Sequence, residues 1–446
     1  MKTPICDFVK RYVSNAPLRM HMPGHKGIGA LGMESLDITE IDGADSLYEA
    51  CGIIRESEQN AAELFGCPTF YSTEGSSQCI RAMLYLISLV AKEHGKAPLI
   101  LAARNAHKTF LSAAALLGTE VEWIFPTEQN SYLSCTVTAD DLEARLSVAS
   151  QKPTAVYITS PDYLGNVANI RELSEICHRH GVLLCVDNAH GAYLKFLSPS
   201  RHPIDLGADL CCDSAHKTLP VLTGGAYLHL AKGLPPSLVA QVKSALALFG
   251  STSPSYLILQ SLDAVNPYLY SGFSEDIAAF LPHVKAFSKR VEEHGYSLVS
   301  DEPFKVTLQT KSYGYTGTDL ADVLRQKGIE CEFSDPDFLV LLLSPTLGVS
   351  TLHKLEQALT SIPRRDEIQA PPVLPSRPAF ALPIRDAMLA PSETLPVQDA
   401  RGRILAAASV SCPPAVPIIV SGEVIDQNTI ACFDYYGIDT CSVVKL

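Results

Sequence analysis

Lys217 stands in the stretch DSAHKTLP (213–220), at a place where a lysine could do covalent chemistry. It follows an apolar run that ends in two cysteines and precedes LPVLTGGAYLHL, a pattern typical of a turn followed by a strand. A lysine amine forms a Schiff base only when it is deprotonated, and partial burial lowers its pKa from about 10.4. Most loop lysines are simply solvated, so the interpretation depends on the residues that other strands bring to the same place.

Six short apolar runs between residues 98 and 230 predict buried strands, because they are rich in branched or aromatic residues and are bounded by turn formers. They are PLILAA (98–103), VEWIF (121–125), AVYITS (155–160), VLLCVD (182–187), DLCCD (209–213) and AYLHL (226–230). Amphipathic segments lie between them, such as TADDLEARLSVAS with Thr138 as a helix cap and IRELSEICHRHG ending in Gly181. The alternation predicts an α/β protein with a mostly parallel sheet.

Polar clusters follow four of these predicted strands. They are RNAHK after the first, SPDYLG after the third, DNAHGAY after the fourth and SAHK after the fifth. Ligands of parallel α/β sheets bind beyond the carboxyl ends of the strands, so we expect the four clusters to form one site. Asp187 ends one strand and Lys217 follows the next, and the chain between them is long enough for one helical crossover.

The segment STEGSSQ (72–78) is a candidate phosphate site, because a long apolar-periodic helix follows it. The expected helix N-terminus contains Gly75, Ser76, Ser77 and Gln78. Free backbone N–H groups and the helix dipole favour an anion there. Simple N-capping by a serine explains the same residues equally well.

A phosphate cradle, an aspartate at a strand end and a lysine after the next strand are together what pyridoxal 5'-phosphate requires. Lys217 would form the Schiff base, and Asp187 would keep the pyridine nitrogen protonated so that the ring accepts electrons from a carbanion. A competing stretch, GIGALG (27–32), fits the glycine pattern of dinucleotide sites, but it lacks the preceding strand and following helix. We therefore expect pyridoxal phosphate rather than a nicotinamide or flavin.

Length and composition limit the class of protein. The chain of 446 residues has room for two or three domains, and its 47% hydrophobic and 19% charged residues are typical of a folded globular protein. A net charge of −13 argues against a nucleic-acid partner. The apolar run AMLYLISLVA is too short for a bilayer and the N-terminus lacks a signal-peptide core, so we expect a cytoplasmic protein without membrane contact. Thirteen scattered cysteines predict reduced thiols, and no histidine–cysteine spacing predicts a metal site.

Several motifs, in order along nearly the whole chain, resemble those of the ornithine/lysine/arginine decarboxylases, pyridoxal phosphate enzymes of the aspartate-aminotransferase fold (fold type I). They are HMPGHKG, TEIDGADSLYEACGII, RNAHKTF, TSPDYLG, VDNAHGAY, DSAHKTLP, STSPSYLILQSLDA and the C-terminal VQDARGRILAAASVSCPPAVPIIVSGEVI. The resemblance implies a carbon–carbon lyase that converts arginine, lysine or ornithine to a polyamine-type amine and carbon dioxide. Another pyridoxal phosphate reaction, by an aminotransferase or a lyase, and a cofactor-binding regulatory protein without turnover stay open.

The resemblance also implies roles for individual residues. Lys217 is the Schiff-base lysine, Asp187 is the partner of the ring nitrogen, and His107 stacks on the cofactor face. Ala189 packs on the opposite face, with His190 close to the ring. Either His190 or Lys217 could return a proton to the α-carbon after carbon dioxide leaves. The residues expected to hold the phosphate are Ser76, Ser77, Ser214 and His216.

The basic side chain of such a substrate needs an acidic partner, for which the candidates are Asp42, Asp45, Glu74 and Asp162. Each is explained equally well as a loop or cap carboxylate, and we expect that role for at least two of the four. Many family members have glutamate in place of Asn188 and asparagine in place of Glu74, so the amino-acid preference does not carry over from the resemblance. The chain also begins at the HMPGHKG region, without the N-terminal wing domain of the large inducible enzymes, so their higher assembly does not carry over either.

The predicted domains are an N-terminal arm (1–45), a large cofactor domain (46–265), a small α/β domain (266–367), and a Pro-rich linker with a C-terminal domain (368–446). In the resembled family the active sites lie at a two-fold interface, and STSPSYLILQ (251–260) looks like the segment that reaches the neighbour's phosphate. We therefore expect a homodimer with shared active sites. An ordinary turn with a capping serine explains this segment as well.

Overall fold

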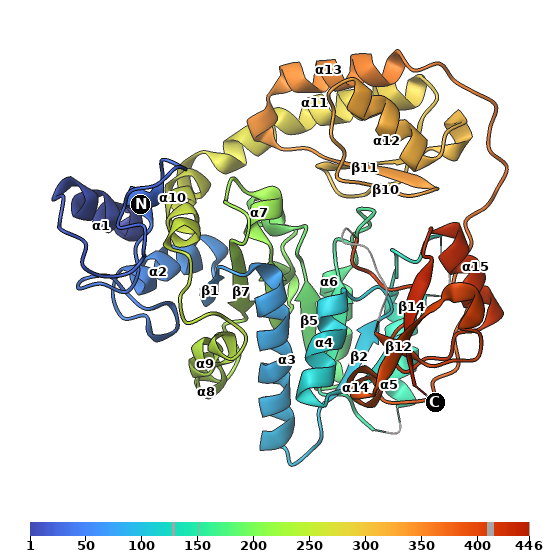
Figure 1. Ribbon diagram of the computed structural model, residues 1–446, viewed down its shortest axis with the longest axis horizontal. Coiled ribbons are helices and arrows are strands. Elements are labelled where there is room, and N and C mark those ends of the chain that lie inside the picture. The colour runs from blue at the N-terminus through green and yellow to red at the C-terminus, as the bar shows by residue number, and fades with distance from the viewer. Residues whose placement is uncertain (127–129, 150, 408–413, 446) are drawn as a thin grey trace. The chain divides into compact units, whose positions relative to one another are not determined.

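The computed structural model describes residues 1–126, 130–149, 151–407 and 414–445. The chain divides into two compact units, one formed by residues 1–97, 154–156 and 170–275, the other by residues 98–153, 157–169 and 276–446. Figure 1 shows their helices and strands. Within the described residues, no helix combines the length and apolarity that crossing a bilayer requires.

The large sheet has seven strands in the order β1-β7-β6-β5-β4-β2-β3. They are β1 (Thr69–Ser72), β2 (Leu99–Ala103), β3 (Glu120–Ile124), β4 (Ala155–Thr159), β5 (Leu183–Asp187), β6 (Leu210–Asp213) and β7 (Ala226–Leu230). β2 pairs in parallel with β3 and β5 with β6, whereas β7 runs antiparallel to both β6 and β1. The six predicted strands and the mostly parallel sheet are confirmed, and β1 is an edge strand outside the predicted set.

Helices of the first unit are α1 (Pro4–Ser14), α2 (Ile53–Phe65), α3 (Gly75–Glu93), α6 (Ile170–Arg179), α7 (Ala215–Thr218), α8 (Pro236–Ala240), α9 (Val242–Ala247) and α10 (Tyr256–Ser271). Short 3-10 turns are η1 (Glu34–Leu36), η2 (Leu47–Glu49), η3 (Ala192–Phe196) and η4 (Pro203–Leu206). The buried Asp263 of α10 accepts hydrogen bonds from the Ser57 hydroxyl of α2 (2.6 Å) and the Cys6 N–H of α1 (2.9 Å). One carboxylate thus ties three helices together.

The second unit contains a small antiparallel sheet in the order β10-β11-β9-β8, with helices on one face (Figure 1). Its elements are β8 (Ser297–Leu298), β9 (Lys305–Gln309), β10 (Phe333–Ser334), β11 (Phe338–Leu342), η5 (Lys311–Tyr313), η6 (Pro345–Leu347), α11 (Phe273–Glu293), α12 (Gly317–Gln326) and α13 (Val349–Thr360). Arg290 of α11 donates to the Glu356 carboxylate of α13 from Nε (2.6 Å) and from Nη2 (2.8 Å). The apolar faces of the helices and this bidentate pair hold the layer together.

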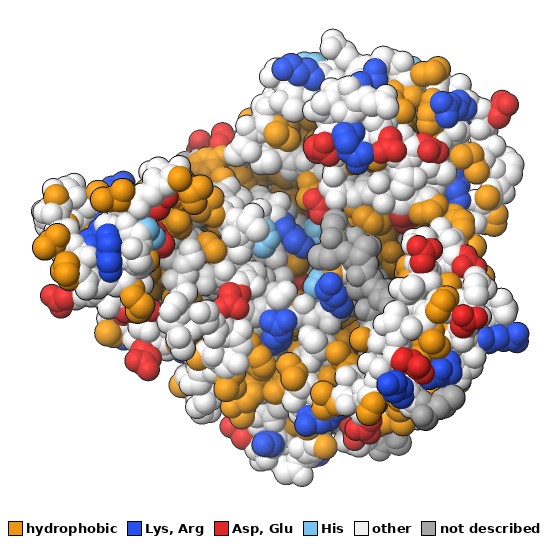
Figure 2. Space-filling model, in the orientation of Figure 1, with side chains coloured by type: hydrophobic (Ala, Val, Ile, Leu, Met, Phe, Trp, Pro, Cys, Tyr) orange, Lys and Arg blue, Asp and Glu red, His pale blue; other side chains and the backbone are white. Residues whose placement is uncertain are grey.

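The C-terminal part of the second unit forms a three-stranded antiparallel sheet, β12-β14-β13. Its elements are β12 (Ser392–Pro396), β13 (Leu405–Ala407), β14 (Thr440–Val444), α14 (Ile384–Leu389), α15 (Gln427–Tyr435) and η7 (Val397–Asp399), while α4 (Lys108–Leu117) and α5 (Ala139–Ser147) belong to the same unit. Leu405, Ile419, Phe433 and Val443 lie in its core. On the face drawn in Figure 2, Lys and Arg side chains are interspersed with Asp and Glu, without a large patch of one sign.

Candidate active site

Lys217 lies in the first turn after the fully buried strand β6, on the short helix α7. Its Nζ is 3.1 Å from Nε2 of His190, which follows β5 and is buried. Asp187, the last residue of β5, is also buried, and its Oδ1 accepts the N–H of Ala189 (3.2 Å). The structure therefore brings an amine, an imidazole and a carboxylate to the ends of two neighbouring parallel strands, as the sequence predicts.

The predicted phosphate cradle lies at the N-terminus of α3, which begins at Gly75. Gly75 has φ +69°, a left-handed conformation that favours glycine, and its N–H donates to the Gly224 carbonyl (2.8 Å). The hydroxyl of Ser214, which precedes α7, donates to that of Ser76 (2.8 Å). No serine side chain caps α3, whose N-cap residue is Glu74. Binding of an anion by these serines stays a prediction.

Gln78 belongs to the predicted cradle, but its side chain is committed elsewhere. Its Oε1 accepts from the Ser72 hydroxyl (2.6 Å), and its Nε2 donates to the Tyr48 hydroxyl (2.7 Å) and the Leu246 carbonyl (2.9 Å). If Gln78 contributes to phosphate binding, it does so through its backbone N–H. Ser77 occupies the same first turn of α3 and is half-buried.

His216 lies beside Lys217 on α7. Its Nδ1 donates to the Gly225 carbonyl (3.0 Å), which leaves Nε2 as the ring atom that could meet an anion. Burial, helped by the charge of Lys217, lowers the pKa of His216. A phosphate would oppose that shift, because a nearby negative charge favours the protonated imidazole.

His107 caps the helix α4. Its Nδ1 accepts the N–H of Thr109 (3.1 Å) at the start of α4, so the proton of the neutral ring lies on Nε2. His107 belongs to the second unit, whereas the other predicted site residues belong to the first. Its stacking on the cofactor stays a prediction.

Two of the four candidate acids have structural roles. Asp45 is buried and accepts backbone N–H groups at the start of α2, among them those of Gly52 (2.8 Å) and Ile54 (3.1 Å). Asp162 accepts the N–H groups of Leu164 (2.9 Å) and Asn166 (2.9 Å) and closes the SPDYLG loop. Burial raises the pKa of Asp162, and hydrogen bonds from Ser134 and Asn166 oppose the shift. The expectation that at least two of the four are cap or loop carboxylates is confirmed.

The other two candidates are exposed. Asp42 lies in the loop before η2. Glu74 precedes the cradle, and its Oε1 accepts the N–H of Ser251 (2.5 Å). Of the four, Glu74 is therefore the carboxylate that directly adjoins the α3 N-terminus.

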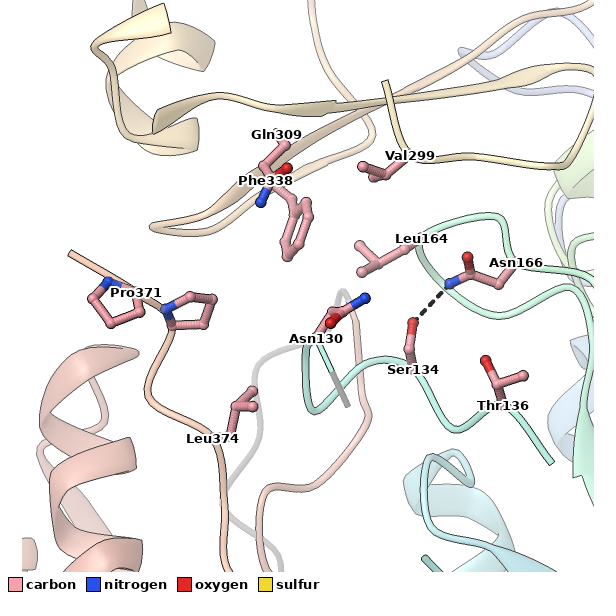
Figure 3. Close-up of a pocket in the computed structure, with 11 residues that line it drawn as sticks. Asn130, Ser134, Thr136, Leu164, Asn166, Val299, Gln309, Phe338, Pro371 and Leu374 are labelled. Atoms are coloured by element: carbon pink, nitrogen blue, oxygen red, sulfur yellow. Dashed lines mark hydrogen bonds between the residues drawn. The ribbon is translucent and has the colours of Figure 1, made fainter. Parts of the chain in front are cut away.

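A pocket of about 420 Å³ lies within the second unit (Figure 3). Its lining consists of Asn130, Ser134, Thr136, Leu164, Asn166, Val299, Gln309, Phe338, Pro371, Pro372 and Leu374. Asn166 donates to the Ser134 hydroxyl (2.8 Å), and both groups also donate to the Asp162 carboxylate, so Asp162 has its oxygens occupied. The described lining offers amides, hydroxyls and an aromatic ring but no charged group, and none of the predicted site residues belongs to it.

A buried cluster around Asp213 lies beside the lysine loop (residues 214–220, which include α7), and the sequence analysis does not predict it. Asp213, the last residue of β6, accepts from Nε2 of both His202 and His229 at 3.1 Å through Oδ2, and from the amide of Asn188 at 2.7 Å through Oδ1. All four side chains are fully buried. Burial acts to raise the pKa of Asp213, but the two histidines more than offset it and hold the pKa well below its usual range. The sequence feature that could have predicted the cluster is an aspartate at the end of a buried strand, because a buried carboxylate needs buried hydrogen-bond donors.

These residues fit a cofactor that carries an aldehyde, a ring nitrogen and a phosphate. The α3 N-terminus with Ser76 and Ser214 suits the phosphate, Lys217 suits the aldehyde, and Asp187 suits a protonated ring nitrogen. The model for the major domain of Orn/Lys/Arg decarboxylases matches residues 3–294, and the model for their C-terminal domain matches residues 373–440. The chain belongs to the Orn/Lys/Arg decarboxylase family. This membership makes it a pyridoxal phosphate-dependent decarboxylase of a basic amino acid and confirms the predicted class of enzyme.

Relatives of this decarboxylase cover nearly its whole length. The chain is 29% identical to an arginine decarboxylase of Bacillus subtilis (strain 168), over 96% of this chain and 92% of the relative. It is also 29% identical, with the same coverage, to an arginine decarboxylase of Halalkalibacterium halodurans.

Solved structures confirm the predicted fold class. The constitutive lysine decarboxylase of E. coli has a TM-score of 0.80 at 18% identity, covering 100% of this chain and 82% of that one. Lysine decarboxylase A of Pseudomonas aeruginosa has a TM-score of 0.83 at 17% identity, covering 99% and 80%. A serine palmitoyltransferase of Sphingomonas wittichii has a TM-score of 0.57 at 14% identity, covering 81% and 83%.

Proposed function

We propose that this decarboxylase acts on arginine in preference to lysine and ornithine, with pyridoxal 5'-phosphate bound at Lys217. The observation that carries the proposal is the Lys217–His190 pair beside the α3 N-terminus. A solvated loop lysine has no need of a buried imidazole and a helix N-terminus at its side. The preference for arginine is supported by relatives named arginine decarboxylase that match over 96% of the chain.

The residues of the chain would divide the work of holding the cofactor. Ser76, Ser214 and the first N–H groups of α3 would bind its phosphate, while Asp187 would keep a proton on the ring nitrogen. When bound, the ring of pyridoxal phosphate accepts the electron pair that carbon dioxide leaves behind. Ala189 and His107 would pack on the two faces of the ring, as the family resemblance implies.

His190 is the residue best placed to move a proton. Its Nε2 lies within hydrogen-bond distance of the Lys217 amine, so it can take a proton from the amine when the lysine must act as a nucleophile. The burial of His190 and Asp187 keeps water away from both groups. We assign to His190, in exchange with Lys217, the return of a proton to the α-carbon.

The proposed enzyme is a cytoplasmic homodimer whose domains have the boundaries predicted above. In the N-terminal arm, large apolar side chains are exposed: Leu18 (86%), Met20 (82%), Met22 (68%), Ile28 (81%) and Leu31 (79%). Such an apolar surface favours cover by a partner, here a second copy of the chain. Residues 251–253 are also exposed and hence available to that copy.

The function is tested by product analysis. Purified protein with saturating pyridoxal phosphate is given arginine, lysine or ornithine, and the amine and carbon dioxide are measured. The proposal is supported if amine and carbon dioxide form in equal amounts and if arginine gives more of both than lysine or ornithine. The Lys217→Ala variant should give none, whereas the Lys232→Ala variant, which alters an exposed lysine of the same unit, should keep full activity. A keto acid in place of the amine would indicate an aminotransferase and contradict it.

A further inference from the structure

The ends of β5 and β6 are joined by a pair of bonds from one residue. Asn188, which follows Asp187, donates its backbone N–H to the Cys212 carbonyl (3.0 Å) and its side-chain amide to the Asp213 carboxylate (2.7 Å). The pairing of the two strands thereby continues one residue beyond Asp187, the last residue of β5. Asp213 in turn directly precedes Ser214 and the lysine loop.

Asp213 is itself held from two other segments. His202 immediately precedes η4 and His229 lies in β7, and each donates Nε2–H to the same carboxylate oxygen at 3.1 Å. The ring of Phe65 packs against both imidazoles, with centroid distances of 5.5 Å and 4.4 Å. Asp213 has no exposed surface, so its orientation is held by these two imidazoles together with the Asn188 amide and the Cys211 thiol.

The chemistry of the pair requires a donor at position 188. The Asp213 carboxylate only accepts hydrogen bonds when it is ionised, and the surrounding histidines favour that form. A second carboxylate at position 188 would face it at hydrogen-bond distance in a dry interior, where one of the two would have to take up a proton. An amide at 188 and a carboxylate at 213 are therefore a matched pair.

We propose that Asn188 and Asp213, braced by His202 and His229, are positioning residues that hold Asp187 and the Lys217 loop in the register needed to bind the cofactor. The inference rests on the proposed roles of Asp187 and Lys217. It predicts that cofactor binding requires one donor and one acceptor across the two strand ends, whichever strand carries the charge.

A metal site is the rival interpretation. Ligand atoms of His202, Cys211 and Asp213 lie within 4.8 Å of one another, and all three residues are buried. The Cys211 thiol donates to Asp213 Oδ1 (3.7 Å), as a protonated thiol does and a metal-bound thiolate does not. Both carboxylate oxygens of Asp213 already accept N–H groups, so hydrogen bonds account for the cluster without an ion.

An exchange experiment tests the proposal. The Asn188→Asp and Asp213→Asn variants each break the pair, and the double variant Asn188→Asp/Asp213→Asn restores it with donor and acceptor interchanged. We expect each single variant to bind pyridoxal phosphate about tenfold or more weakly, and the double variant to recover most of that loss. The pH midpoint of the absorbance change of the Lys217-bound cofactor should shift in the single variants and return in the double one. Exposed Asn15→Asp and Asp301→Asn serve as controls.

Two further readouts separate the possible failures. Thermal unfolding of the cofactor-free proteins measures the Asn188–Asp213 pair itself. If the double variant recovers thermal stability but the unaltered protein carries no pyridoxyl group on Lys217, the proposed function is refuted and the pairing is not. The positioning role is overturned if the single variants lose thermal stability while their cofactor affinity and pH midpoint stay unchanged. It is also overturned if the double variant binds as weakly as the weaker single one, or if the protein carries stoichiometric zinc that His202→Gln removes.

Discussion

The amine of Lys217 lies 3.1 Å from Nε2 of His190, so a proton can pass between the two residues. The His190→Gln variant keeps a side chain of similar length but cannot exchange that proton. We expect its kcat to fall by roughly 10²-fold, with little change in the amount of cofactor bound. Steady-state kinetics checks this against His283→Gln, an exposed histidine of the second unit that should leave kcat unchanged. A kcat of His190→Gln within twofold of the unaltered enzyme would exclude His190 as the proton carrier.

Asp187 ends β5 in a buried position and is assigned to the ring nitrogen. The Asp187→Asn variant keeps the shape of the side chain but removes the negative charge that holds a proton on that nitrogen. It should retain cofactor and lose most turnover, roughly 10²-fold or more. Cofactor content by absorbance and kcat by carbon dioxide release test this together, and turnover near that of the unaltered enzyme would refute the assignment.

The family resemblance predicts that the sites are shared between two chains and that residues 251–253, which are exposed, reach the neighbour's phosphate. A Lys217→Ala chain has no lysine of its own, and a Ser251→Ala/Thr252→Ala/Ser253→Ala chain lacks what it would give its partner. Co-refolding the two inactive variants would create one site with both contributions intact, so partial activity should return.

The result also decides where the segment acts, since the N–H of Ser251 already bonds to Glu74 of its own chain. Mixtures as inactive as their components, or a monomer in solution, would show that each chain completes its own site. Co-refolded Lys217→Ala with unaltered chains provides the reference activity for mixed dimers.

Asp335 predicts a pH-dependent effect on stability. Its Oδ1 accepts the N–H groups of Asp337 (2.8 Å) and Phe338 (2.7 Å), while burial, assisted by the charge of Asp337, raises its pKa to about 6. The folded protein thus keeps a proton that the unfolded chain releases from about pH 4 upward, so stability falls as the pH rises from about 4 to 6.

The Asp335→Asn variant keeps the acceptor and removes the charge. It should be more stable than the unaltered protein at pH 8, by about 1–2 kcal/mol, and lose that advantage at pH 4. Denaturant unfolding at the two pH values measures the difference. The exposed Asp366→Asn should show no such pH dependence, and an equal effect of Asp335→Asn at both pH values would contradict the raised pKa.

The strand ends that carry the chemistry could be predicted because their signals are local. Short apolar runs bounded by turn formers predict β5 and β6 to within one residue at each end, and Asp187 and Lys217 follow directly from those ends. The helix start at Gly75 was equally visible, since a long apolar-periodic segment follows it. These features depend only on residues that are close together in the chain, so the local sequence pattern is enough to predict them.

The remaining features depend on partners far away in the chain. The apolar run of β7 does not show that this strand is antiparallel to β6. The Gln78 side chain donates to the carbonyl of Leu246, which lies far along the chain. The cluster around Asp213 joins Asn188, which follows β5, with residues of β6, β7 and the segment before η4, and only the folded chain shows which polar groups meet. Buried polar pairings are set by tertiary packing, which the local pattern does not encode.

The most direct test of the account is the location of the cofactor. Purified protein is incubated with pyridoxal phosphate, reduced with borohydride, digested and mapped by mass spectrometry. The pyridoxyl group should lie on Lys217, and it should be absent from that peptide in the Lys217→Ala variant. A pyridoxyl group on another lysine, such as Lys232 or Lys243, with Lys217 unmodified, would contradict the assignment of the site and the mechanism built on it.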